Sequence, residues 1–278
     1  MTGTVVNIAG YRFADLPDRN NLQQPLRDIC DKLALKGTIL LAYEGINFFL
    51  AGSQTGVDYF IEFLESDERL ADIPLKISYS DTQPFRRMNV RLKKEIISLG
   101  MEHIKPTERT GEEITPTEFK QLIDDGEDLL ILDTRNEYEC KIGTFDNAVE
   151  LDIRSFRDFP RALSELDHKL KDKQVVMFCT GGIRCEKASL VMMDAGYSNV
   201  KQLKGGILGY FEEVGGAHWS GDCFVFDQRV AVNPQLEETD VVQCFACREP
   251  LLLEEQECTN YVIAKSCLYC IDKVRLPD

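Results

Sequence analysis

The sequence lacks the features that mark several common classes of protein. No apolar run approaches the roughly 18 residues that cross a membrane, so a membrane protein is not expected. The N-terminus has no basic stretch followed by an apolar core, so a secretory signal is not expected and the cytoplasm is the expected compartment. No GxGxxG, P-loop, flavin or nicotinamide motif is present, so no organic cofactor is evident.

Histidine and positive charge are also scarce. The three histidines are isolated, at spacings that suggest neither a metal-ligand pair nor a catalytic triad. The net charge of −15 excludes a protein coated in basic surface, and DNA is not an expected partner. Binding to nucleic acid depends on local patches, and the first 110 residues are the least repulsive to phosphate, with 14 basic and 15 acidic side chains.

One basic strip stands out against this acidic background. It lies beside Phe85 and consists of Arg86, Arg87, Arg91, Lys93 and Lys94. Two interpretations remain open: a strip that contacts RNA phosphates, or a solvated strand face beside a linker.

The pattern of strands and helices divides the chain into parts. Residues 1–97 follow the order β-α-β-β-α-β, which predicts a ferredoxin-like (acylphosphatase-like) α+β domain suited to RNA binding. Residues 98–113 are polar, contain proline and lack periodicity, as a linker does. Strands alternate with helices over residues 114–215, which predicts an α/β domain with a mainly parallel sheet. Residues 216–278 form a small cysteine-rich C-terminal segment.

Ten cysteines without a secretory signal favour catalytic, metal-binding or buried roles over disulfides. Cys30 and Cys140 stand alone and are expected to be small buried hydrophobes. Near the C-terminus, two CxxC pairs are separated by 19 residues: Cys244, Cys247, Cys267 and Cys270. This spacing is typical of a structural zinc site with four thiolates, which leave no open position for catalysis. A thiol or disulfide clasp without metal is the alternative.

The remaining cysteines include one in an unusual loop. The apolar strand "VVMF" is followed by Cys179, Thr180, Gly181, Gly182, Ile183 and Arg184, and then by a helix. Two glycines allow backbone N–H groups to converge, and the helix adds the positive end of its dipole. We therefore expect Cys179 to have a pKa below the usual 8.5 or so, and to be nucleophilic at neutral pH.

The residues around this loop have predicted roles of their own. Cysteine-dependent phosphatases place an arginine six positions after the cysteine, but here that position is Cys185, so phosphatase activity is disfavoured. Cys185 either resolves an oxidised or persulfidated Cys179 or simply packs in its helix. Arg184 either points at a substrate phosphate or braces the loop. Asp133 and Arg135, at the end of another strand, are expected to hold the loop through hydrogen bonds.

Longer motifs resemble a known family. The stretches "LDTRNEYECKIGTFDNAVELDI" and "VVMFCTGGIRCEKASLVMMDAGYSNVKQLKGGILGY" resemble the two signatures of a rhodanese domain, which would occupy residues 114–215. Together with "ILLAYEGINFFLAG" and the paired CxxC motifs, "CTGGIRCEKAS" resembles the rhodanese-containing tRNA uridine hydroxylases. The resemblance implies oxygen-dependent conversion of the wobble uridine to 5-hydroxyuridine. It also implies molecular oxygen as co-substrate, the anticodon region of tRNA as partner, and Cys179 as the essential residue.

The chemistry of uracil is compatible with this implied activity. Uracil is electrophilic at C6, and a Cys179 thiolate adding there leaves electron density at C5, the carbon to be oxygenated. A persulfide on Cys179 is a second route, and the sequence does not choose between them. Two other functions remain open: a rhodanese-type sulfurtransferase that uses a Cys179 persulfide, and a catalytically idle adaptor, against which the intact loop argues.

Overall fold

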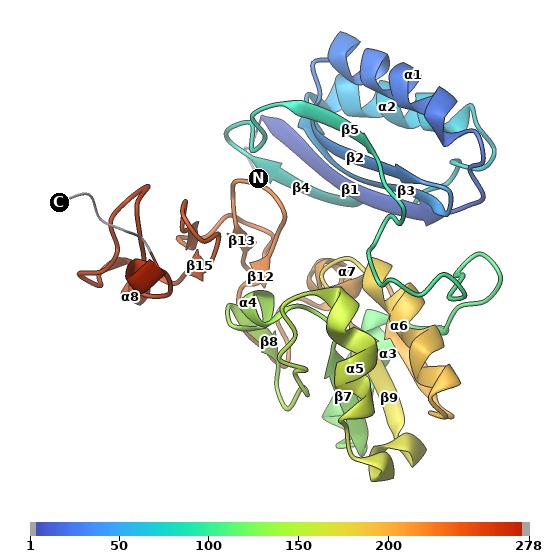
Figure 1. Cartoon of the computed structure of the whole chain (residues 1–278), viewed down its shortest axis with the longest axis vertical. Coiled ribbons are helices and arrows are strands. Elements are labelled where there is room, and N and C mark those ends of the chain that lie inside the picture. Colours follow the sequence, from blue (N-terminus) through green and yellow to red (C-terminus); the bar gives the residue numbers. More distant parts are fainter. Residues whose placement is uncertain (1–3, 274–278) are drawn as a thin grey trace.

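A computed structural model of the chain describes residues 4–273 and shows three parts (Figure 1). The N-terminal domain, blue to teal, packs above the central domain, green to yellow, and the C-terminal segment, orange to red, extends to one side. Within the described residues, no helix is both long and apolar enough to cross a membrane.

The N-terminal domain has the predicted ferredoxin-like order, which is confirmed. Its sheet runs β4-β1-β3-β2-β5, and β5 lies parallel to β2 as an added edge strand. The elements are β1 (Val5–Phe13), α1 (Arg19–Lys32), β2 (Lys36–Ala42), β3 (Gly45–Gly52), α2 (Gln54–Glu65), β4 (Lys76–Ser80) and β5 (Met88–Leu92).

The two faces of this sheet have different neighbours. Alternate residues of β1, such as Val6 and Ile8, join a core with the side chains of α1 and α2, which cover one face (Figure 1). The intervening residues, Tyr11 and Phe13, pack instead with Ile183 of the central domain. Part of the second face is therefore covered by the central domain.

The central domain is built on a parallel sheet of order β6-β10-β9-β7, as predicted. Continuous apolar runs such as "QVVMF" in β9 are buried because helices cover both faces of such a sheet. The elements are β6 (Glu112–Ile114), α3 (Pro116–Asp124), β7 (Leu129–Asp133), α4 (Glu137–Cys140), β8 (Gly143–Phe145), η1 (Phe156–Asp158), α5 (Phe159–Ser164), η2 (His168–Asp172), β9 (Gln174–Phe178), α6 (Ile183–Asp194), β10 (Val200–Leu203) and α7 (Gly206–Val214).

The connection between the two domains is irregular but closely packed. Leu99 and Ile104 lie in the predicted linker, yet both are buried in the core of the central domain. Strand β6 also begins at Glu112, inside the predicted linker. Isolated apolar residues among polar ones give no periodic pattern, so the sequence offered no sign that this stretch is anchored.

The C-terminal segment starts as part of the central domain. Its first strand pairs with β8, and Trp219 packs in an aromatic cluster with Phe145 and Phe178. Beyond it, short paired strands lead to the CxxC motifs. The elements are β11 (Trp219–Gly221), β12 (Cys223–Phe224), β13 (Ala231–Val232), β14 (Val242–Gln243), β15 (Pro250–Leu251), α8 (Leu253–Gln256) and η3 (Ile271–Lys273).

Candidate active site

The thiol loop lies where β9 ends, at the carboxyl edge of the parallel sheet. Gly182 adopts φ +100°, and its N–H donates to the Cys179 sulfur at 3.1 Å. The start of α7 fixes the loop from the other side, because the N–H groups of Ile207 and Leu208 donate to the carbonyls of Cys179 and Thr180 at 3.0 and 3.1 Å. Backbone groups therefore set the shape of the loop.

The same groups set the ionisation of Cys179. Burial raises the pKa of this thiol, but the Cys185 thiol, the positive charge of Arg184 and the N–H groups of Arg184 and Gly182 together lower it to about 6. Burial and the adjacent Cys179 sulfur raise the pKa of Cys185 well above its usual range, so Cys185 remains a protonated donor. At neutral pH the arrangement holds Cys179 as a thiolate.

This thiolate is not open to solvent. Cys179 is 0% exposed, and the N-terminal domain contributes to its cover. The Tyr11 hydroxyl of β1 donates to Glu186 at 3.1 Å. It also lies close over Gly182 of the loop, because a Cβ atom added to this glycine would be only 3.0 Å from the hydroxyl. Burial raises the pKa of Tyr11, so it stays a neutral donor. Substrate must therefore reach the sulfur through a movement of the loop or of the domain above it.

An ion cluster around a buried lysine joins the two domains beside this loop. Lys187 of α6 is 1% exposed, and its Nζ contacts Glu44 Oε2 and Glu95 Oε2, each at 2.8 Å. It also donates to the carbonyl of Ile97 at 3.1 Å. The two carboxylates come from the β2–β3 turn and from the stretch after β5, so the lysine ties the N-terminal domain to the helix that starts at the thiol loop.

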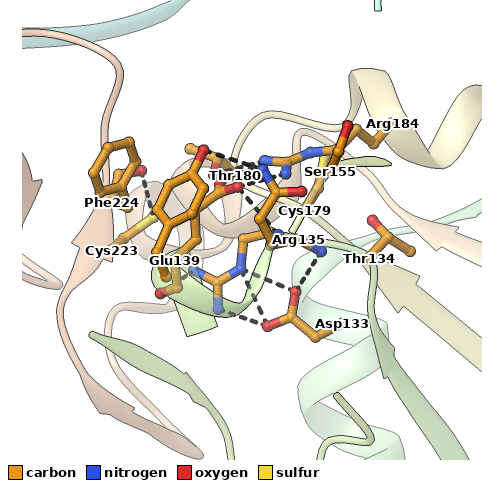
Figure 2. A network of polar contacts seen from close by, with 12 residues as sticks. Asp133, Thr134, Arg135, Glu139, Ser155, Cys179, Thr180, Arg184, Cys223 and Phe224 are labelled. Atoms are coloured by element: carbon orange, nitrogen blue, oxygen red, sulfur yellow. Dashed lines mark hydrogen bonds and ion pairs between the residues drawn. The ribbon is translucent and has the colours of Figure 1, made fainter. Parts of the chain in front are cut away.

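Arg184 braces the loop instead of pointing outward. Its guanidinium donates two hydrogen bonds of 2.6 Å to Glu139, a fully buried carboxylate of α4. Glu139 also accepts from the Thr180 hydroxyl at 3.2 Å (Figure 2). Of the two predicted roles, the structure places Arg184 in the bracing one, because both carboxylate oxygens are bound.

Asp133 and Arg135 form a second buried pair below the loop. Arg135 is 0% exposed and donates to Asp133 Oδ2 at 2.6 Å (Figure 2). It also donates to the Gly143 carbonyl at 2.6 Å and lies 5.3 Å from the centre of the Trp219 ring. The pair thus connects β7 to β8 and to the C-terminal segment. Neither side chain hydrogen-bonds to Cys179, so the contacts of the pair stabilise the surrounding elements and not the thiol itself.

The four paired cysteines come together as a separate cluster. Their sulfurs all lie within 4.8 Å of one another, with Cys247 and Cys267 at 3.5 Å and Cys244 and Cys270 at 3.9 Å. Zinc–sulfur bonds of about 2.3 Å in a tetrahedron place sulfurs roughly 3.8 Å apart, so the residues fit a zinc ion. Cys258 and Cys223 lie outside the cluster.

Comparisons with known proteins match this three-part arrangement. Residues 5–96 match the family described as the UPF0176 acylphosphatase like domain, and residues 115–213 match the rhodanese-like domain. A protein of Cupriavidus necator named tRNA uridine(34) hydroxylase is 50% identical over 272 residues, which cover 96% of each chain. This chain belongs to the tRNA uridine(34) hydroxylase family.

Two further relatives carry the same name. The tRNA uridine(34) hydroxylase of Cupriavidus metallidurans is 50% identical over 273 residues, covering 96% of this chain and 97% of the relative. That of Burkholderia thailandensis is 49% identical, covering 96% of this chain and 93% of the relative. The resemblance drawn from the thiol loop, the "YEGIN" turn and the CxxC pairs is confirmed.

In this tRNA uridine(34) hydroxylase family member the basic strip follows the edge strand of the N-terminal sheet. Arg86, Arg87, Arg91, Lys93 and Lys94 are all exposed, along and beside the edge strand β5. They share one edge of the N-terminal sheet.

Sequence reasoning missed three residues that touch or hold the loop: Tyr11, Glu139 and Lys187. Glu139 had a signal, since it follows Asp133 and Arg135 within the rhodanese-like stretch "LDTRNEYECKIG". Tyr11 and Lys187 had none, because their partners lie 175 and 143 residues away in the chain.

Proposed function

We propose that this chain hydroxylates uridine 34 of tRNA at C5, with molecular oxygen as co-substrate and Cys179 as the reacting group. The observation that carries the proposal is the Cys179 thiolate, held with a pKa of about 6 in a chain whose full-length relatives are named tRNA uridine(34) hydroxylase. A sulfurtransferase would need only the central domain. The match instead spans 96% of the chain, which favours the hydroxylase.

Cys179 has two routes to this chemistry. As a thiolate it adds to C6 of the uracil and leaves electron density at C5, which takes one oxygen atom from O2. Loss of the C5 proton and release of the sulfur then restore the double bond, and a reductant of the thiol class supplies the two electrons that convert the second oxygen atom to water. As a persulfide carrier it presents a softer sulfur to the same carbon. The protonated Cys185 beside it is placed to return a proton, whereas attack on an oxidised Cys179 sulfur would first require its deprotonation. Arg184 holds the loop in either route, through Glu139.

We propose that the anticodon region of tRNA is bound partly through the basic strip. Five exposed cations along β5 are suited to backbone phosphates, and the acidic remainder of the chain discourages binding elsewhere. Such a substrate agrees with the predicted cytoplasmic compartment. Replacing Arg91 and Lys93 by glutamine should weaken tRNA binding. It should also reduce the slope of log affinity against log salt concentration by roughly one to two, because two phosphate contacts are lost.

The cysteine cluster has a structural part in this proposal. If zinc is bound by Cys244, Cys247, Cys267 and Cys270, it supplies cross-linking of two short turns that have little core of their own. Four thiolate ligands complete its coordination, so the reaction does not pass through it.

Mass spectrometry of tRNA nucleosides tests the proposed activity. Cells without this protein should lack 5-hydroxyuridine and its derivatives, and the wild-type gene should restore them. The Cys179→Ser variant should not restore them, whereas Cys30→Ala, a buried cysteine of α1, should. An unchanged nucleoside profile together with lost sulfurtransferase activity would favour the alternative function.

A further inference from the structure

A cavity lies where the three parts of the chain meet, directly beside the thiol loop. It encloses about 580 Å³ of empty volume, its open mouth included. Phe49 of β3 lines it from the N-terminal domain, Phe226 from the turn after β12, and Thr180 from the loop itself. Cys179 does not line the cavity, but Thr180 is the next residue and its carbonyl is fixed by the N–H of Leu208. A ligand here sits next to the reacting sulfur.

The cavity presents an aromatic ring that is fixed but still accessible. Phe226 is 43% exposed, although its ring is held by Phe49 at 5.8 Å and Phe224 at 5.2 Å between ring centres. The Arg184 guanidinium lies 5.9 Å from the same ring. A large exposed aromatic side chain beside a reactive loop is suited to stacking against a planar ligand, and a nucleobase has such a π-face.

The cavity also presents a partly buried cation. Lys76 of β4 lines it, and the hydrogen bonds and ion pairs of residues 4–273 include none from its ammonium. Its Nζ packs against Gly205. A Cβ atom at this position would lie only 2.3 Å from the Nζ, so only glycine leaves room for the ammonium. Burial lowers the pKa of Lys76, and the exposed Glu212 on the cavity wall does not pair with it. The three donors of this ammonium are therefore available to a ligand oxygen as well as to water.

We propose that this cavity is the subsite for the uracil base of nucleotide 34, which stacks on Phe226 while Lys76 donates to one of its carbonyl oxygens. The proposal rests on the proposed function and adds the place where the substrate base binds. A neutral base fits better than a phosphate because apolar side chains such as Phe49, Phe85 and Val225 make up much of the wall. The base binds beside the closed loop, and uncovering Cys179 is a separate step.

Binding of two anticodon stem-loops tests this subsite. They are labelled with a fluorophore and are identical except that position 34 is a uridine in one and an abasic site in the other. The wild-type protein should bind the uridine form roughly 5- to 150-fold more tightly, the range expected for one stacked base. Phe226→Ala should lose most of this preference and Phe226→Tyr should keep it. Lys76→Gln should reduce it.

A matched control checks that the effect is local. Tyr59→Ala removes another aromatic ring of similar exposure, 54%, on helix α2 away from the cavity, and should keep the wild-type preference. Equal melting temperatures of all variants would show that folding is unchanged.

The two proposals fail in different ways. Equal wild-type affinity for both stem-loops, or a preference that survives Phe226→Ala, overturns the subsite. So does a Lys76→Gln variant that weakens both stem-loops by the same factor, because that result assigns Lys76 to a phosphate. Formation of 5-hydroxyuridine by the wild-type protein, measured in the same samples, reports on the proposed function independently.

Discussion

Replacing Cys185 by alanine should raise the pKa of Cys179. Cys185 is fully buried in α6 and its thiol stabilises the Cys179 thiolate. A hydrogen bond to a charged group contributes about 1.5–3 kcal/mol, and one pKa unit corresponds to about 1.4 kcal/mol. The pKa of Cys179 should therefore move from about 6 to roughly 7–8. At pH 6.5 the thiolate fraction would fall from roughly three quarters to roughly one tenth.

The assay is the pH dependence of alkylation at Cys179, followed by peptide mass spectrometry. The buried sulfur will react slowly, but the midpoint of the pH profile still reports its ionisation. Cys30→Ala is the control: burial raises the pKa of Cys30 to about 12, so its removal should leave the Cys179 midpoint unchanged. A Cys185→Ala midpoint that stays at about 6 would refute the role given to this thiol.

Other parts of the account can be tested separately. Asp133→Ala leaves the Arg135 guanidinium buried without its partner and should lower the free energy of unfolding by about 3–5 kcal/mol in urea titrations. Breaking an exposed pair such as Lys105–Glu108 should leave the unfolding midpoint nearly unchanged. Lys187→Met should speed alkylation of Cys179 at saturating pH, because the N-terminal domain is held less firmly over the loop. Unaltered labelling would contradict that. Cys267→Ser should reduce bound zinc, measured by elemental analysis, from about one per chain to near zero, and a wild-type protein purified without metal would argue for the thiol clasp.

The sequence was most informative where the structure depends on neighbouring residues. The order of strands and helices predicted both folded domains, and the run from Val175 to Arg184 predicted a thiol at a strand end above a helix start. These features depend on local periodicity and on the position of glycines, and both can be recognised in a single sequence. The paired CxxC spacing likewise predicted that four sulfurs converge, as they do within 4.8 Å.

Contacts between domains were beyond such reasoning. Glu44 and Lys187 each read as a surface charge, and only the packed structure brings them to 2.8 Å. The choice between the two roles of Arg184 depended on Glu139, 45 residues earlier. The same holds for the cavity, whose walls come from three distant parts of the chain. Positions that pair across such separations have no periodic signal.

The central claim is that an ionised Cys179 acts on the wobble uridine, and its most direct test is 5-hydroxyuridine formation as a function of pH. With purified protein and tRNA lacking the modification, the wild-type yield should fall as the pH drops through about 6, in step with the alkylation midpoint of Cys179. Cys179→Ser should give no product at any pH. Product formed by Cys179→Ser at the wild-type rate, or a wild-type yield that ignores the ionisation of Cys179, would contradict the account.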